Sequence, residues 1–406
     1  GFNDEDLIQA AIAQLRSLPY YHALMDKATA QIGELAERLK RVAPVPMAKV
    51  FFANSGSEAN DTLVKLAWYY NNARGRPEKK KIISRHLGFH GVTCAAGSVT
   101  GIELFHREFD LPINDRFLHT DCPHHYRFAH PGESEEAFAS RCAENLERMI
   151  LEEDPDTVAA FFAEPAMGSG GCIVPPRTYF QKIQAVLDKY DVLFFADEVI
   201  TGFGRTGKMF GCETFGIRPD AMSLAKGLSS SYQPISAVMV SQKLYDALVV
   251  QSRDLGVFAH GFTTTGHPVA IAVALRCQQI MEERDILGHV AEVAPALQSG
   301  LKSFEDHPLV GNVRGVGMMG ALELVADKAT RRSFEAAHHV KTHLVDRARE
   351  HGVIVRYAAT GDTLSFAPPL IITECEIEEL LSKFSKALDD TTRWVERNNL
   401  RSPSRD

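Results

Sequence analysis

The chain has 406 residues, of which 45% are hydrophobic and 24% charged, and its formal net charge is −8 at pH 7. This length allows a large buried core, and the acidic balance argues against a surface for nucleic acid or anionic membrane. No apolar run reaches the roughly 18 residues of a membrane helix, and seven scattered cysteines without C-x-x-C predict reduced thiols, no metal site and a cytoplasmic location.

The first part of the chain predicts two helices. The stretch NDEDLIQAAIAQLRSL is typical of an amphipathic helix with Asn3 as its N-cap, and a second helix is expected over residues 26–41. We therefore expect residues 1–45 to form an N-terminal helical segment. A further upstream segment is expected to be absent from this chain.

Between residues 46 and 284, short apolar runs alternate with helical patterns. The runs are almost continuously hydrophobic, which favours strands buried on both faces of a mostly parallel sheet. Strands that alternate with helices predict a doubly wound α/β domain, with the sheet flanked by helices. The expected strands are KVFFAN, KIISR, VAAFFAE, VLFFAD, AMSLA and ISAVMVS, and the expected helices span residues 57–74, 134–153, 176–190, 242–251 and 267–284.

The pattern changes after residue 285. A long helix is followed by VRGVGMMGALELVA, a helical pattern over residues 332–351, the runs GVIVRYA and DTLSFAPP, and a closing helix. Residues 285–406 are therefore predicted to form a smaller α+β domain at the C-terminus.

The segment FFADEVITGFGRTGK contains a G-x-G-x-x-G pattern, and Asp220 follows Gly202 by 18 positions. In a dinucleotide-binding unit such glycines directly follow the strand and open a helix. Here five residues separate the strand from the glycines, and KMFGCETFGIRPD contains more Gly and a Pro, which do not suit a long helix. We expect a tight loop and no dinucleotide site.

Small residues follow the first apolar run of the α/β region. The run ends at Asn54, Ser55, Gly56 and Ser57 turn the chain, and an amphipathic helix is expected to start at Glu58. Free backbone N–H groups at a helix N-terminus bind anions. The same residues would also serve as an ordinary capping box, and the pattern alone leaves both interpretations open.

Two ionisable residues end two other apolar runs. Asp197 ends VLFFAD, and Lys226 ends AMSLAK. One interpretation is a simple ion pair between them, because a buried acid needs a cationic partner. The other is that the strand ends of an open α/β sheet meet at one crevice, where ligands bind. An anion site, a buried acid and a desolvated lysine in one crevice are what pyridoxal phosphate requires.

The residues of these strand ends resemble class III (omega) aminotransferases, which have the type I pyridoxal-phosphate fold. The matching motifs, in chain order, are NSGSEAND, FHGVT, AEPAMGSGG, DEVITGFGRTGKMFG, SLAKGL and HGFTTTGHP. They are most similar to the branch that moves an amino group from an amine or omega-amino compound to pyruvate, giving alanine and an aldehyde or ketone.

The resemblance implies roles for these residues. Lys226 would form the Schiff base with pyridoxal phosphate and carry the proton between the substrate α-carbon and C4′, and Asp197 would bind the pyridine nitrogen. Gly56 and Ser57 would hold the phosphate together with Thr263, which reaches in from the neighbouring subunit of a homodimer. A further pairing of dimers is left open.

Three more residues would surround the cofactor ring. Phe89 of FHGVT would stack on one face and Val199 would cover the other. Without that function, Phe89 would be an ordinary core aromatic. His90 is expected to support its neighbours rather than to act as an acid or base.

Several positions bear on the substrate. Arg356 lines up with the mobile arginine that grips the acceptor carboxylate, and the alternative is an ordinary exposed arginine at a strand end. Enzymes of the family that use 2-oxoglutarate have a fixed arginine near Ser365, and tend to have Gln in place of Met167 and Ile200. Glu164 would pair with that fixed arginine, so its role here stays open between pocket polarity and loop structure.

The resemblance places Leu24, Met25, Ser169 and Val92, with Tyr21, at the border of the substrate pocket. The donor and its stereochemistry are left open. Alternatives to the amine–pyruvate reaction are a 4-aminobutyrate-like transaminase that uses 2-oxoglutarate, an aminomutase, and a non-catalytic protein on the same fold.

Overall fold

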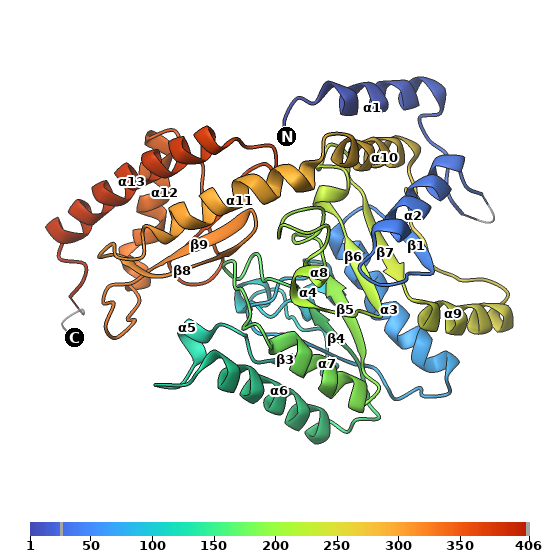
Figure 1. Ribbon diagram of the computed structural model, residues 1–406. Helices are drawn as coiled ribbons and strands as arrows, with labels where there is room; N and C mark the ends of the chain where they lie inside the picture. Colours follow the sequence, from blue (N-terminus) through green and yellow to red (C-terminus); the bar gives the residue numbers. More distant parts are fainter. Residues whose placement is uncertain (25–26, 403–406) are drawn as a thin grey trace.

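The computed structural model describes residues 1–24 and 27–402, and its larger part is built around a seven-stranded sheet (Figure 1). The strand order is β1-β7-β6-β5-β4-β2-β3. These strands are β1 (Lys49–Ala53), β7 (Ser236–Val240), β6 (Ala221–Leu224), β5 (Leu193–Asp197), β4 (Val158–Ala163), β2 (Lys81–Arg85) and β3 (Phe117–Thr120). All six expected runs form strands, and β3 was not expected.

The sheet is mostly parallel. Strands β3, β2, β4, β5 and β6 pair in parallel, whereas β7 is antiparallel to both of its neighbours, β6 and β1. Because β1 and β6 both oppose β7, they run in the same direction. The carboxyl ends of the six strands other than β7 therefore meet at one edge of the sheet, where open α/β sheets bind ligands.

Side chains of the central strands are buried on both faces of the sheet, which explains their continuous hydrophobicity. Phe162 and Phe195 pack with helix α3 (Gly56–Ala73) on one face. Phe161 and Phe194 pack on the other face with helices α2 (Ala30–Val42), α6 (Glu135–Glu152) and α7 (Tyr179–Lys189). The neighbouring phenylalanines of β4 and β5 make edge-to-face contacts, with ring centroids 5.6 and 5.1 Å apart.

Two expectations for the N-terminal helices were wrong. Helix α1 (Glu5–Ser17) is capped by Asp4, whose side chain accepts a hydrogen bond from the Asp6 N–H, and not by Asn3. Helix α2 begins at Ala30 rather than near residue 26, after an extended Thr29.

Helix α1 lies on α10 (Pro268–Glu283), which follows α9 (Gln242–Leu255) in the chain (Figure 1).

A second sheet, fully antiparallel, lies in the C-terminal part of the chain, in the order β10-β11-β9-β8. Helices α11 (Ile286–Lys302), α12 (Val340–Glu350) and α13 (Glu374–Arg397) accompany it (Figure 1). The helix expected over residues 332–351 is shorter, because apart from a 3₁₀ turn at Ala336–His338 it begins at Val340. The strands are β8 (Val310–Val316), β9 (Met319–Leu324), β10 (Arg356–Tyr357) and β11 (Thr363–Phe366).

The predicted fold class is confirmed: a mostly parallel sheet flanked by helices, with a smaller antiparallel sheet near the C-terminus. The domain boundaries at residues 45 and 284 stay predictions. Among the described residues, no helix combines the length and the apolar character that a membrane crossing needs.

Candidate active site

The carboxyl ends of β1, β2, β4, β5 and β6 surround a cavity of about 240 Å³. Each of these strands is followed by residues that line it, so the cavity lies where the parallel sheet predicts a ligand site. The structure brings eight of the predicted site residues to its wall: Gly56, Ser57, Phe89, His90, Glu164, Asp197, Val199 and Lys226.

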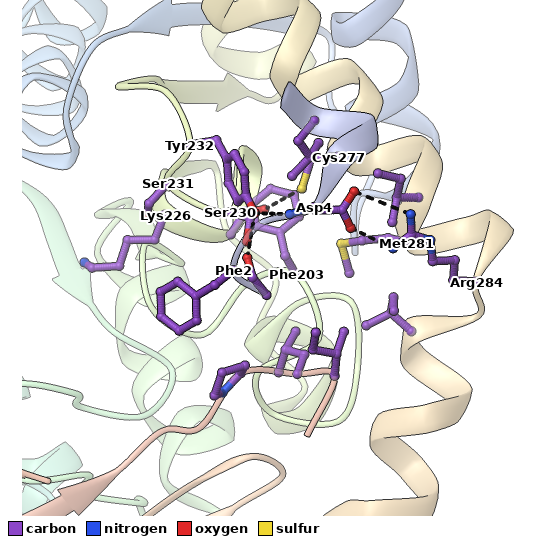
Figure 2. A pocket seen from close by; sticks show the side chains of 18 of the residues that line it. Phe2, Asp4, Phe203, Lys226, Ser230, Ser231, Tyr232, Cys277, Met281 and Arg284 are labelled. Atoms are coloured by element: carbon purple, nitrogen blue, oxygen red, sulfur yellow. Dashed lines mark hydrogen bonds and ion pairs between the residues drawn. The ribbon is translucent and has the colours of Figure 1, made fainter. Parts of the chain in front are cut away.

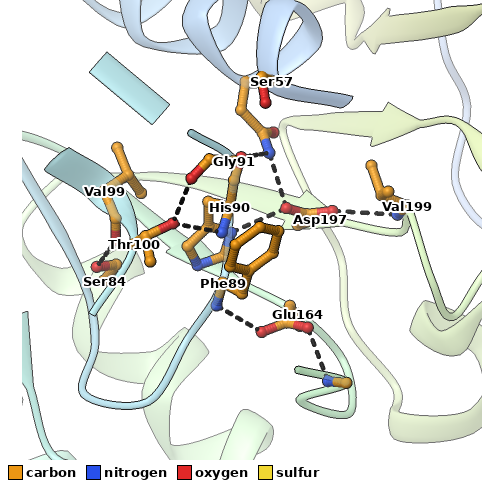
Figure 3. A network of polar contacts seen from close by, with 12 residues as sticks. Ser57, Ser84, Phe89, His90, Gly91, Val99, Thr100, Glu164, Asp197 and Val199 are labelled. Atoms are coloured by element: carbon orange, nitrogen blue, oxygen red, sulfur yellow. Dashed lines mark hydrogen bonds and ion pairs between the residues drawn. The ribbon is translucent and has the colours of Figure 1, made fainter. Parts of the chain in front are cut away.

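The carboxylate of Asp197, at the end of β5, accepts three hydrogen bonds (Figure 3). Its Oδ2 lies 2.8 Å from Asn60 Nδ2 and 2.9 Å from His90 Nδ1, and its Oδ1 accepts from the Val199 N–H at 3.1 Å. Burial of the Asp197 carboxyl opposes ionisation, but the hydrogen bonds from His90, Asn60 and Val199 outweigh it, so the pKa of Asp197 lies below its ordinary value. Asp197 is therefore held as a buried anion.

His90 faces Asp197 rather than open solvent. The residue is 2% exposed, its Nδ1 bonds the carboxylate, and its backbone N–H donates to Thr100 Oγ1 at 2.8 Å. This geometry fixes the orientation of both Asp197 and the loop after β2. It agrees with a supporting role for His90, which stays a prediction.

Asn60 is a member of this network that the sequence reasoning missed. It lies on α3, 1% exposed, and its Nδ2 donates both to Asp197 and to the His90 carbonyl at 2.7 Å. A signal was present, because Asn60 follows Gly56 by four positions and thus lies on the same helix face. Asn60 ties the helix, the loop after β2 and the acid of β5 together.

Lys226 follows β6 and has a backbone φ of +40°, in the left-handed region. The next residue must be small, since a Cβ at Gly227 would lie 2.9 Å from Phe203. The turn after Lys226 leads to Tyr232, whose hydroxyl accepts from the Asp4 N–H at 2.8 Å (Figure 2). In that view the Lys226 side chain extends away from Tyr232 and from the Asp4–Arg284 ion pair.

The surroundings of Lys226 favour the neutral amine. Burial lowers the pKa of Lys226, the charges of Asp197 and Glu164 partly offset this, and the positive charge of Arg356 adds to the lowering. The ion pairs of the described residues do not include one between Lys226 and Asp197. The simple ion-pair interpretation is therefore not what the structure contains, and the two groups face one cavity instead.

The N-terminus of α3 has both a side-chain cap and free N–H groups, the two interpretations that its sequence left open. Ser55 caps the helix, because its hydroxyl accepts from the Glu58 N–H at 3.2 Å. The N–H groups of Gly56 and Ser57 begin the helix, where no intrahelical acceptor exists, and both residues line the cavity. A Cβ at Gly56 would lie 3.2 Å from Val199, so glycine keeps this wall open.

Glu198, next to Asp197 in the chain, has a different task. Its side chain accepts from the N–H groups of Gly211 at 2.9 Å and Cys212 at 2.6 Å, at the start of the five-residue helix α8 (Gly211–Phe215). The glycines between the two segments form turns and open no helix after β5. This confirms the expected loop, and of the two neighbouring acids only Asp197 lines the cavity.

Glu164, after β4, is buried and 3% exposed. It accepts from the N–H groups of Phe89 at 3.0 Å and Gly168 at 2.8 Å (Figure 3). Burial raises the pKa of Glu164, and the nearby charge of Asp197 raises it further. Its carboxyl group thus connects the loop that carries Phe89 with residues 167–173.

A neighbouring cavity of about 310 Å³ contains Ser169 and Arg356. It adjoins the first cavity, because Ile200 lines both. Arg356, on β10, is the one charged residue in its described lining, and Ser365 of β11 lies directly opposite Arg356 in the strand pairing. The position that would hold a fixed arginine is thus next to Arg356.

The remaining predicted residues that the structure describes lie outside the linings of these two cavities. Val92 is 65% exposed, and its N–H donates to Ser57 Oγ at 3.2 Å. Leu24 lies near Gly261, and Thr263 is exposed on the segment between α9 and α10. Tyr21 stacks on His22, and Met25 lies outside the described residues.

The profile of the family "Aminotransferase class-III" matches residues 1–388 of this chain. The chain is a class III aminotransferase. A solved omega transaminase from Pseudomonas jessenii, in complex with PMP, shares 54% identity at a TM-score of 0.95, over 98% of this chain and 87% of that one. A structure of a transaminase with L-Ala shares 49% identity at a TM-score of 0.95, over 97% and 92%.

Among curated relatives, this aminotransferase is 50% identical to "Gamma aminobutyrate transaminase 3, chloroplastic" of Solanum lycopersicum, over 98% of this chain and 76% of that protein. It is also 50% identical to "Gamma-aminobutyrate transaminase 1, mitochondrial" of Oryza sativa subsp. japonica, over 97% and 76%. These relatives and the family match confirm that the chain is an enzyme of the transaminase class.

The cofactor of this aminotransferase is pyridoxal phosphate, as in its family. The residues present fit the group, because the cavity offers helix N–H groups for a phosphate, an ionised acid for a pyridinium and an amine of lowered pKa. The substrates are an amine donor and a keto acid acceptor.

Proposed function

We propose that this aminotransferase moves the amino group of a primary amine or omega-amino compound to pyruvate, giving alanine and an aldehyde or ketone. The observation that carries the proposal is the single guanidinium of Arg356 in the cavity beside the cofactor site, with Ser365 opposite it on the neighbouring strand.

Lys226 and Asp197 would perform the chemistry. Bound pyridoxal phosphate supplies an electron sink that makes a proton on the donor carbon removable. The Lys226 amine, whose pKa is lowered by burial, would accept that proton and deliver it to the C4′ position. The Asp197 carboxylate would hold a proton on the pyridine nitrogen, and His90 and Asn60 would keep Asp197 ionised.

Other residues would fix the position of the cofactor. The N–H groups of Gly56 and Ser57 would bind the phosphate, and Phe89 and Val199 would cover the two faces of the ring. Thr263 is exposed and outside the cavity lining of its own chain, which suits a contact with the site of a second subunit. We propose a homodimer with shared sites on this basis.

Charge matching supports pyruvate as the acceptor. A guanidinium pairs with a carboxylate through two parallel hydrogen bonds, and Arg356 offers one such fork. The second carboxylate of 2-oxoglutarate would need another cation, and the residue paired with Arg356 is the uncharged Ser365. The relative that binds L-Ala is in accord with an alanine product.

The donor is proposed to include 4-aminobutyrate, because curated relatives 50% identical over almost the whole chain are named for it. A solved omega transaminase variant engineered for the synthesis of bulky amines supports amines without a carboxylate as further donors. Both kinds of donor carry a primary amine on a carbon without an α-carboxylate. The cytoplasmic location expected from the sequence stays a prediction.

A donor and acceptor panel tests this function. Purified protein loaded with pyridoxal phosphate would be given 4-aminobutyrate, β-alanine or an arylalkyl amine, with pyruvate or 2-oxoglutarate, and the alanine or glutamate formed would be measured. We expect alanine from pyruvate at a kcat/KM at least about tenfold above that for 2-oxoglutarate, and Lys226→Ala should lower kcat by about 10³-fold or more. Turnover without any acceptor would instead indicate an aminomutase.

Arg356→Ala separates the acceptor from the donor. Losing a charge-assisted pair of hydrogen bonds costs about 1.5–3 kcal/mol, so the KM for pyruvate should rise about 10- to 100-fold while the half-reaction with an arylalkyl amine is nearly unchanged. Equal losses in both half-reactions would contradict the role of Arg356. Arg356→Lys is the matched control that keeps the charge without the planar fork.

A further inference from the structure

The segment between α9 and α10, residues 256–267, forms neither a helix nor a strand. Gly256 ends α9 with a φ of +79°, and the segment then contacts α3 before Pro268 begins α10. Thr263 lies in this segment, which we call the strap. A strap without its own backbone ladder needs side-chain contacts to hold one conformation.

His260 makes the polar contacts of the strap with α3, beside an edge-to-face contact of Phe258 with Tyr69 of that helix. Its Nε2 lies 2.9 Å from Thr62 Oγ1 and its Nδ1 lies 2.9 Å from Lys65 Nζ, so both ring nitrogens are bonded to the same helix. The ring also stacks on Phe51 of β1, with centroids 5.1 Å apart, and meets Phe258 and Phe262 of the strap edge-on.

The hydrogen bonds determine the protonation of the ring. The Thr62 hydroxyl donates to the Glu58 carbonyl at 2.7 Å, so the Thr62 oxygen must accept from His260 Nε2–H. The Lys65 ammonium has only donors, so Nδ1 must accept from it. The ring is thus neutral with its hydrogen on Nε2, in agreement with a pKa of His260 lowered to about 4 by burial and by Lys65.

We propose that neutral His260 is the positioning residue that fixes the strap on α3, the helix whose N-terminal N–H groups bind the phosphate of its own subunit. The inference rests on the function proposed above. The contact then links that phosphate site to Thr263, which would contact the phosphate bound in the second subunit. Thr62 and Lys65 lie roughly one and a half and two and a half turns after the phosphate-binding residues, so the strap takes its position from the same helix.

The later part of the strap has separate contacts. Tyr20 donates to the Thr263 carbonyl at 2.7 Å, and the Phe262 N–H donates to Thr265 Oγ1 at 2.9 Å. Losing the His260 contacts should therefore loosen residues 257–262 most.

Hydrogen exchange of the cofactor-loaded protein tests the anchor. His260→Phe keeps an aromatic ring but removes both polar contacts, and Thr62→Val removes the acceptor while nearly preserving shape. Both variants are expected to exchange amide hydrogens of residues 257–262 at least about fivefold faster than the parent protein, because the strap opens more often. His260→Gln, which keeps a donor near the Nε2 position, should restore part of the protection.

Thr391→Val is the matched control. Thr391 is also fully buried, and its hydroxyl also donates to the carbonyl four residues earlier, on α13, but it has no contact with the strap. This variant should leave strap exchange unchanged. Unchanged exchange in both His260→Phe and Thr62→Val would overturn the anchor, whatever the donor and acceptor panel shows for the proposed reaction.

The release rate of pyridoxal phosphate, followed by absorbance, tests the link to the phosphate. It should rise at least about threefold in His260→Phe and Thr62→Val, and not in Thr391→Val. A strap that loosens without faster release would overturn the link between His260 and the phosphate site.

Discussion

Asp197 is ionised although burial opposes its charge, and the three donors around it explain how. Two of them, His90 and Asn60, converge on the same oxygen, and Asn60 also holds the His90 backbone carbonyl. The Asn60 amide alone therefore stabilises both the charge of Asp197 and the position of the loop that bears Phe89. Removing that amide should affect the cofactor more than the fold.

The matched pair Asn60→Ala and Asn71→Ala tests this interpretation. Both residues are 1% exposed on α3, but the Asn71 amide donates only to the Ala67 carbonyl of its own helix. We expect Asn60→Ala to raise the pKa of Asp197 and to weaken pyridoxal phosphate binding about tenfold, measured by titration of cofactor absorbance. Asn71→Ala should lower thermal stability with little change in cofactor affinity; similar losses of affinity in both would argue against a specific role for Asn60.

At the scale of elements, the short pairing of β10 with β11 sets Arg356 opposite Ser365. Ser365→Arg would place a second guanidinium beside the first, which matches the two carboxylates of 2-oxoglutarate. The ratio of kcat/KM for 2-oxoglutarate to that for pyruvate should rise about tenfold or more. Ser365→Gln, a polar side chain without charge, serves as the control, and an equal rise there would rule out the electrostatic explanation.

The elements differ in how well their sequences predicted them. The strands β4, β5 and β6 were found because burial on both faces leaves a continuous apolar run. Strand β3, FLHT, was missed because it is a short edge strand with a polar residue, whose one neighbour is β2. The start of α2 was misplaced because Lys27 and Ala28 suit a helix but lie outside it.

The residues of the site also differ in how well the sequence predicted them. Lys226 and Asp197 could be predicted, since an ionisable residue that ends a buried run is unusual. Asn60 could not be assigned, because its partners His90 and Asp197 lie 30 and 137 positions away and come together only through the strand order. The contact of His260 with α3 likewise depends on the path of the strap, which has no periodic pattern.

At the scale of the whole molecule, two histidines make stability depend on pH. Burial lowers the pKa of His119 to about 4, with help from His86 and His106, and burial and Lys65 lower that of His260 to about 4. An unfolded histidine titrates near 6.5, so the unfolded chain takes up these protons first as the pH falls. Their contribution to stability is full above pH 6.5 and declines progressively toward pH 4.

Urea unfolding of the protein at a series of pH values checks this expectation. The midpoint should fall as the pH is lowered from about 6.5 to 4.5, and His260→Phe should show a smaller decline than the parent protein. An equal decline in His260→Phe and in the parent protein would contradict the contribution of His260. Carboxylates whose pKa is lowered, such as Glu133 at about 2, act in a more acidic range.

The backbone at Lys226 occupies a conformation that glycine adopts freely and that a lysine adopts only at a cost. The chain therefore loses some folding free energy at the position where the proposed chemistry requires an amine. A screen for stabilised variants would therefore select glycine at position 226, and the gain in stability would come with loss of the proposed activity. Stability and catalysis thus make opposite demands on this one residue.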